Sequence, residues 1–504
     1  MQPVPYQHGM PLQTMQIPGQ APAGYTYVMP QVQPLTPIPK DIQMVRVSSP
    51  WKVYGRILGT VVVATFLAQL IFMVPYGMAL GEPALSVCGG IFAAPFVFLL
   101  AYLRRPRLIH VQRALPDPNG ATVHRLAMGG ALATPVPTTF NHHVVRDDSL
   151  LDTPPSKTAW LLFTGLLIIT TLLTALYLSS EAGAIVAILL FIIIGIPAWL
   201  LGFSIPVMAW WSWCTRRLGL HTMQRESESW LVGGMLSAIP ALTINSMLFP
   251  LMAGLFLSTE MVELMIPVIS APFGEEICKG LFVLAFASTI DSPRRGFQVG
   301  FTVGLGFAML ENLIYVLSSS FGGPIAFTFT TLVRGIGSIP GHAFWTGLTG
   351  VGLGYWLMRR KERLAKTNPQ TVAEQEMNPD PLEWKLIDPK TGEFVGEENP
   401  ESTHLDASEL LGEFRLPLLE PMSKLPESGA IVIPKNPILG LSLAILGHMA
   451  WNGSITIVDL ATTAAGWSTG AALGAQILLS VFLVAGMLLL GRGIVRGVMN
   501  APTP

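Results

Sequence analysis

The sequence predicts an all-α polytopic membrane protein, a bundle of about ten transmembrane helices with a cytoplasmic insertion. Of its 504 residues, 51% are hydrophobic and only 12% are charged, which lies outside the range of ordinary soluble domains. Apolar runs recur along the chain, and each approaches the roughly 20 helical residues that cross a hydrocarbon core. The 30 basic and 31 acidic residues nearly balance, so nucleic acid is not an expected partner. The lipid bilayer is the expected surrounding.

The N-terminal segment 1–48 is rich in Pro and Gln and has no charged residue before Lys40. It has neither a basic start nor a continuous apolar core, so it does not resemble a secretory signal peptide. Its frequent prolines favour extended, unpaired backbone. We expect a disordered cytoplasmic tail.

Ten apolar runs follow, and they divide the chain into regions. Five runs fall in an N-terminal membrane region, 49–257. A second membrane region comprises 258–358 and 437–460, and a polar, acidic, Pro-rich insertion, 359–436, interrupts it. Residues 461–504 provide the final span and a short tail. The predicted spans are 57–80, 84–103, 159–178, 184–211, 231–257, 263–290, 297–319, 325–357, 437–459 and 470–491.

Basic residues lie in alternate connections between these runs. The connections 81–83, 179–183, 258–262, 320–324 and 460–469 contain no Lys or Arg. The segments at the opposite ends of the spans contain basic residues, for example Arg104, Arg105, Arg216, Arg217, Arg294, Arg295, Arg359, Arg360, Arg492 and Arg496. By the positive-inside rule both termini are expected in the cytoplasm, which agrees with an even number of spans.

The sixth run carries ionisable residues at its centre. Glu275, Glu276 and Lys279 have apolar residues on both sides for more than one helical turn. Each charge at bilayer depth costs at least about 2.5 to 3.5 kcal/mol, so such residues usually mark a pathway or an active site. Glu275 and Lys279 are four residues apart and Glu276 and Lys279 three, so either pair can meet on a helix. One ammonium cannot serve both acids equally, which leaves one carboxylate for general acid or base chemistry.

Three later patches also place polar groups inside apolar runs. They are Phe307-Ala-Met-Leu-Glu311-Asn312, then Arg334 with Gly341-His342-Ala-Phe-Trp345, and His448-Met-Ala-Trp451-Asn452. Because the bilayer offers them no water, we expect these groups to face one another around a shared cavity. His448 and Asn452 are four residues apart and could together donate two hydrogen bonds to a developing oxyanion.

These four motifs resemble those of the PrsW family of intramembrane proteases, which is related to the type II CAAX-prenyl proteases. The paired glutamates with Lys279, the FxxxEN patch, Arg334 with His342, and the HxxWN patch occur in the family's order, over roughly 260–460. The resemblance implies a PrsW-like catalytic core in 258–358 and 437–460. It also implies a multi-pass bacterial plasma-membrane peptidase of the glutamic type, whose substrate is a membrane-anchored protein such as an anti-sigma factor.

The resemblance also implies roles for individual residues. Glu275 is expected to act as the general base on water, with Glu276 held by Lys279. His448 and Asn452 are expected to stabilise the oxyanion, and no cofactor is required in this interpretation.

Two questions stay open at this point. The prenyl-protease relatives carry His where this chain has Glu311, so either Glu311 or His342 could hold the water. A metal-dependent protease is the alternative, with zinc bound by Glu275, Glu311, His342 and His448, since imidazole and carboxylate suit that metal.

Two further classes of protein explain part of the pattern. A proton-coupled transporter would use the buried Glu and His residues as a relay. It does not account for the HxxWN patch, and the two halves show no corresponding broken helices. A non-catalytic scaffold of the same fold would tolerate changes at Glu275.

Overall fold

The computed structural model describes residues 48–106, 108–125, 131–146, 149–367, 386–387, 394–395 and 429–502. The expected tail, apart from Ser48, and most of the insertion 359–436 lie outside these residues. The chain divides into two compact units. One, the helical unit, comprises Arg46–Arg104, Ser149–Met377 and Arg415–Pro504, and the other includes Arg105–Asp148.

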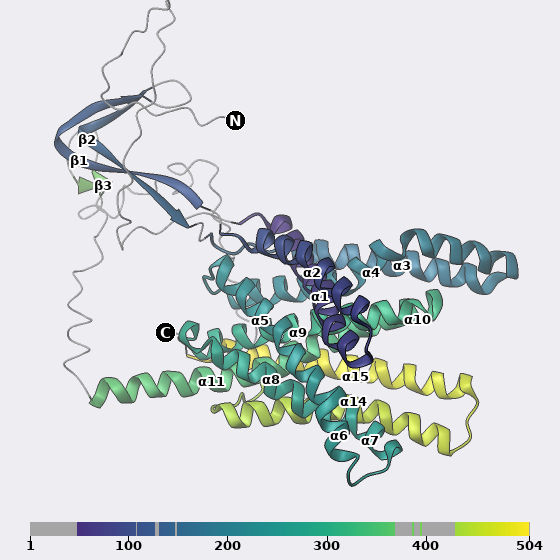
Figure 1. Ribbon diagram of the computed structural model, residues 1–504. Helices are drawn as coiled ribbons and strands as arrows, with labels where there is room; N and C mark the ends of the chain where they lie inside the picture. The colour runs from purple at the N-terminus through teal and green to yellow at the C-terminus, as the bar shows by residue number, and fades with distance from the viewer. Residues whose placement is uncertain are drawn as a thin grey trace, which may run out of the picture. The chain divides into compact units, whose positions relative to one another are not determined.

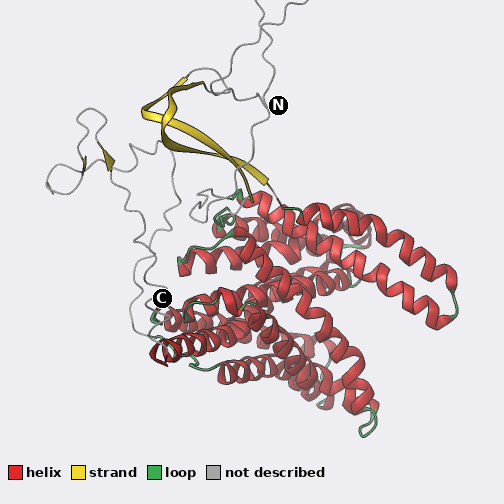
Figure 2. Cartoon of the chain, turned by 60° about the vertical axis from the view of Figure 1, so that its left-hand side comes forward, coloured by secondary structure: helices red, strands yellow, loops and turns green. Residues whose placement is uncertain are grey.

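The helical unit confirms the predicted class of all-α polytopic membrane protein (Figures 1 and 2). Eight described helices are long and apolar enough to cross a membrane. They correspond to the predicted spans except the sixth and the eighth. They are α1 (Pro50–Leu80), α2 (Pro83–Arg104), α3 (Ser156–Ser179), α4 (Glu181–Leu218), α5 (Gln224–Thr243) continued through η1 (Ile244–Leu248) and α6 (Phe249–Ala253), α9 (Pro293–Ser320), α14 (Pro437–Ala464) and α15 (Thr469–Met499).

The predicted sixth and eighth spans are helical but interrupted by π turns. The sixth consists of α7 (Thr259–Met265), the π turn η2 (Ile266–Ser270) and α8 (Ala271–Ala285), followed by a short 3₁₀ turn. The eighth consists of α10 (Gly323–Val333), the π turn η4 (Arg334–Ser338) and α11 (Ile339–Thr367). Proline in η2 and glycines in η4 weaken the regular α pattern at these points. Both interrupted segments carry residues of the predicted site.

Helix α9 lies at the centre of the helical unit. In the most apolar 18-residue stretch of α9, 78% is buried inside the protein. The corresponding figure for α2 is 11%. Helix α9 packs closely along α11, because Gly300 and Gly304 face the backbone of that helix and a Cβ atom at either would collide with it. Small residues permit this close approach of helices in membranes. The two helices therefore form a rigid support for the side chains of the site.

The other unit contains a β-hairpin that the sequence analysis did not predict. Strands β1 (Leu108–Arg125) and β2 (Ala131–Arg146) pair antiparallel, from Leu108 opposite Arg146 to Pro116 opposite Thr138, with an irregular register beyond Pro116. Prolines within both strands argued against a sheet, since proline cannot donate to a ladder. A two-stranded ribbon has only edge strands and tolerates them. A small second pair, β3 (Leu386–Ile387) and β4 (Phe394–Val395), falls within the predicted insertion.

Candidate active site

Helix α8 presents its three ionisable residues to the interior of the helical unit. Glu275, Glu276 and Lys279 are all buried, and the Lys279 side chain is fully so. The π turn η2 immediately precedes α8, and π turns frequently occur at functional sites. The charges predicted at bilayer depth therefore point into protein and not into lipid, as their desolvation cost requires.

The ammonium group of Lys279 lies at the centre of the polar cluster. Its Nζ atom is 2.7 Å from Glu276 Oε1, 3.4 Å from Glu275 Oε2 and 2.8 Å from His342 Nδ1. It also lies 3.8 Å from the centre of the Phe307 ring, close enough for a cation–π contact. One cation thus connects α8, α9 and α11.

The two adjacent glutamates have different surroundings. Glu276 Oε1 accepts hydrogen bonds from Lys279 and from His448 Nδ1 at 3.1 Å, and its Oε2 accepts one from Thr346 at 3.2 Å. Among the described residues, the shortest polar contact of Glu275 is its 3.4 Å approach to Lys279, and its side chain is 10% exposed against 0% for Glu276. Glu276 is therefore an anchored carboxylate, whereas Glu275 keeps acceptor capacity for another molecule.

His342 is held at both ring nitrogens. Nδ1 lies against Lys279, and Nε2 lies 2.9 Å from Glu311 Oε2. Because an ammonium can only donate, Nδ1 accepts and Nε2 carries the proton that it donates to the carboxylate. Glu311 in turn pairs with Arg334, whose guanidinium also contacts Asn312. Glu311 and Arg334 fix the orientation of His342.

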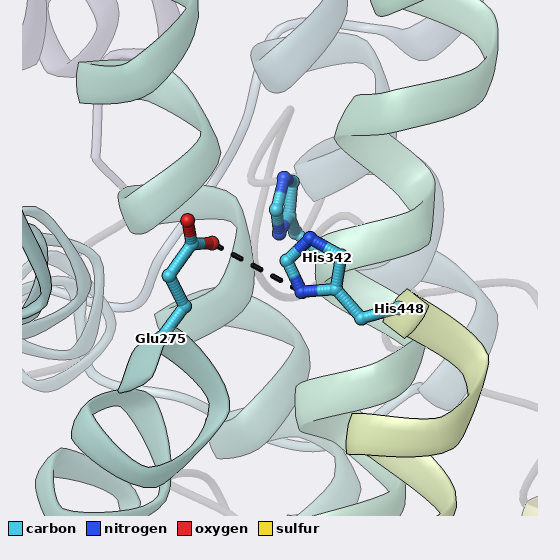
Figure 3. Close-up of side chains that lie close together, drawn as sticks. All are labelled: Glu275, His342 and His448. Atoms are coloured by element: carbon cyan, nitrogen blue, oxygen red, sulfur yellow. Dashed lines mark ion pairs between the residues drawn. The ribbon is translucent and has the colours of Figure 1, made fainter. Parts of the chain in front are cut away.

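His448 enters the cluster from α14. Its ring stacks on Trp345, with centroids 4.8 Å apart and planes at 16°, and lies 4.9 Å from the His342 ring. Figure 3 shows Glu275, His342 and His448 pointing toward one another from three helices. The dashed line in it joins Glu275 Oε2 and His448 Nδ1, which are 4.0 Å apart. One ligand atom of each of these three residues lies within 4.8 Å of the other two.

Asn452 makes a backbone contact that the sequence did not predict. Its amide donates a 2.9 Å hydrogen bond to the backbone carbonyl of Pro267, inside η2. This contact joins α14 to the turn that precedes the glutamates, and it does not pair Asn452 with His448. Asn452 therefore has a structural contact, and its hydrogen bond to the oxyanion stays a prediction.

Thr346 is a contact residue that the sequence analysis did not identify. It lies four residues after His342 and therefore on the same face of α11. That spacing was the available signal, but threonines in apolar helices are common and usually bond their own backbone. Trp345 belongs to the Gly341–Trp345 patch of the sequence, and its stacking on His448 depends on how α11 and α14 pack.

Comparison with known proteins identifies part of the helical unit. A family model described as the PrsW family intramembrane metalloprotease matches residues 229–372. No curated protein and no solved structure shows a significant match to the chain. The matched segment begins about thirty residues earlier than the resemblance predicted and ends before α14, so His448 lies outside it. Residues 229–372, which include all of α8, α9 and α11, are thus similar to the PrsW family of intramembrane proteases.

Proposed function

We propose that the helical unit hydrolyses a peptide bond of a membrane-anchored protein, using water activated by Glu275 and no metal ion. The observation that carries the proposal is the difference between the adjacent acids. Glu276 accepts hydrogen bonds from Lys279, His448 and Thr346, whereas Glu275 faces the two imidazoles with its acceptor capacity available. A general base must be able to reach the proton that it removes.

The spacing around Glu275 suits one water molecule. Two atoms that each lie about 2.8 Å from the same water can be up to about 5.6 Å apart. The 4.0 Å separation of Glu275 Oε2 and His448 Nδ1 falls within this range, as does the 4.8 Å limit for the cluster. Because His448 Nδ1 is already bonded to Glu276, Glu275 holds the water and the His448 ring lies beside it. His342 is fixed by Lys279 and Glu311 and shapes the site.

The reaction follows from these positions. Glu275 removes a proton from water as the water oxygen attacks the carbonyl carbon of the substrate. In its imidazolium form, His448 donates Nδ1–H to Glu276 and presents Nε2–H as a donor to the oxyanion. Glu275 then returns the proton to the amide nitrogen, the C–N bond breaks, and a carboxylic acid and an amine are formed.

The matching family is described as a metalloprotease, so the cluster must be tested as a metal site. Its donor set, one carboxylate and two imidazoles, is chemically suitable for zinc. The arrangement is not, because both nitrogens of His342 are engaged and an ammonium occupies the space beside Glu275. A divalent ion there would have to displace Lys279 and would be repelled by it. We therefore assign the central positive charge of the site to Lys279.

The substrate and membrane orientation complete the proposal. Arginines at alternate helix ends favour cytoplasmic termini. The resemblance to the PrsW family supports a bacterial plasma-membrane location and a single-span regulatory protein, such as an anti-sigma factor, as substrate.

Comparative proteomics of membrane fractions tests this function. Cells expressing the wild-type chain are compared with cells expressing Glu275→Gln, and peptides with new termini inside or next to a predicted span are quantified. The expected result is at least one fragment that only the wild type produces. Glu263→Gln is the matched control, since Glu263 is an exposed acid on α7 of the same segment. Equal fragment patterns for wild type and Glu275→Gln, at equal protein levels, would remove Glu275 as the base.

A further inference from the structure

A cleft separate from the candidate active site lies between α4, α11 and α15. It encloses about 300 Å³. Phe344 forms part of its wall, and this residue follows His342 by two positions on α11, so the two side chains leave the helix about 200° apart. The cleft thus lies on the opposite side of α11 from the polar cluster. Its lining includes Trp210, Trp213, Arg217, Phe344, Leu488 and Arg492.

The cleft combines apolar walls with positive charge. Arg217 lies in the last turn of α4 and is buried, whereas Arg492 lies near the end of α15 and is exposed. None of the described residues that line the cleft is acidic. Within the described part of the chain, Arg492 forms no ion pair. Two guanidinium groups beside an apolar surface favour an anionic ligand that also carries an apolar part.

The depth of the cleft in the bilayer indicates the type of anionic ligand that it can bind. Trp210 and Trp213 lie near the basic end of α4, where tryptophans mark the boundary between headgroups and acyl chains. The indole N–H of Trp210 donates to the carbonyl of Gly335, so its ring is fixed as a wall. Leu488 is 40% exposed and continues into Leu489 and Leu490, which are also exposed. The apolar side of the cleft therefore joins a surface that lipid tails cover.

We propose that this cleft binds one anionic phospholipid of the cytoplasmic leaflet. The phosphate lies between Arg217 and Arg492, and an acyl chain lies along Phe344 and Leu488. Basic pockets between helices on the cytoplasmic side are suited to anionic headgroups. A soluble phosphate would satisfy the arginines but would leave the apolar wall uncovered.

Binding at this position stabilises the packing behind the candidate active site. Phe344 packs edge-to-face on Phe301 of α9 and lies against Trp210 and Trp213 of α4. A lipid between α4 and α15 therefore braces the helix that carries His342. We expect the lipid to raise the thermal stability of the helical unit.

The test uses the full chain, purified in an uncharged detergent. Native mass spectrometry counts retained lipid, and thermal unfolding is followed with added phosphatidylglycerol or phosphatidylcholine. We expect one retained phosphatidylglycerol and a higher Tm with that lipid only. Each guanidinium contributes about a fivefold change in affinity. Arg492→Gln should therefore weaken binding about fivefold, and Arg217→Gln with Arg492→Gln about 25-fold. Lys361→Gln, which removes an exposed charge from α11, is the control and should bind as the wild type does.

Several results would overturn the proposal. Equal retention of both lipids, or equal binding by wild type and Arg492→Gln, would show that the arginines select no anion. An equal Tm increase with inorganic phosphate alone would assign the site to a soluble anion. If the double variant does not fold, Arg492→Gln and the charge-conserving Arg492→Lys decide the question, because Arg492 is exposed and Lys should retain more binding than Gln.

Discussion

Lys279 Nζ lies 2.8 Å from His342 Nδ1, a contact that joins α8 to α11 and gives the site a positive charge of its own. The same ammonium lies 2.7 Å from Glu276. Because a covalently attached cation cannot be removed by dialysis, this contact separates the proposed chemistry from that of a metal-dependent protease.

Replacement of Lys279 by Met should abolish cleavage and lower the Tm. Loss of one partner of a buried ion pair costs about 3 to 5 kcal/mol, since the other charge remains without compensation. Lys279→Met with Glu276→Gln should recover much of the stability but none of the activity. Unfolding in detergent micelles and fragment formation measure the two effects. Wild-type stability of Lys279→Met would contradict the central position of the ammonium.

Chelation of divalent metals should leave the cleavage rate unchanged. The enzyme is dialysed against EDTA and against 1,10-phenanthroline, and the rate is compared with that of untreated enzyme. The reason is that the Lys279 ammonium, 3.4 Å from Glu275 and 2.8 Å from His342, supplies a positive charge beside both residues. Inactivation that added zinc reverses would establish the metal-dependent alternative.

The adjacent glutamates should respond differently to substitution. Glu275→Gln should reduce cleavage by about 10² to 10⁴, the usual contribution of a general base, with little change in Tm. Glu276→Gln should lower both, because Glu276 anchors Lys279, His448 and Thr346. Activity and Tm of each variant are measured in parallel. A larger loss of stability in Glu275→Gln than in Glu276→Gln would reverse these assignments.

The pair Glu311 and Arg334 should act through His342. Glu311→Gln removes the charged acceptor of His342 Nε2, and Arg334→Met removes the partner of that acceptor. Each should lower the rate about 10- to 100-fold, the range seen when groups that orient a functional histidine are removed. The double variant should be no worse than the more severe single one. Independent, multiplicative losses would show that the two residues do not work through one histidine.

Gly300→Ala should destabilise the helical unit. A Cβ atom there would collide with the backbone of Thr346, which cannot move without shifting α11. Gly165→Ala on α3 is the control, since a Cβ atom there has nothing within 4 Å. Alanine is a better helix former than glycine, so the control should be neutral or slightly stabilising. Equal Tm values for the two variants would contradict the close α9–α11 contact.

Sequence patterns were sufficient to predict the helical segments, because the bilayer restricts spanning backbone to a few forms. The clustering of Glu275, His342 and His448 was predictable for a related reason, since ionisable groups in lipid must find partners. The contact of Lys279 with His342 was not predictable from the sequence, because it depends on the angle and separation of α8 and α11. The hydrogen bond from Asn452 to the carbonyl of Pro267 depends on the π turn η2, which the sequence pattern did not predict.

The β-hairpin was missed for a different reason. Pro116 and Pro118 in one strand, and Pro135 and Pro137 in the other, are signals against a sheet. They are tolerated because the hairpin has no central strand, which is a property of the final pairing and not of either segment alone.

The length of the π turn η2 determines the direction in which the side chains of Glu275 and Glu276 leave α8. A π turn holds one residue more than an α turn, and each helical residue rotates the chain by about 100°. Shortening η2 by one residue would leave the composition of α7 and α8 intact yet turn one helix about its axis relative to the other. The direction in which Glu275 faces is therefore set by the number of residues in the turn as much as by their chemistry, so insertions and deletions there are more harmful than most substitutions.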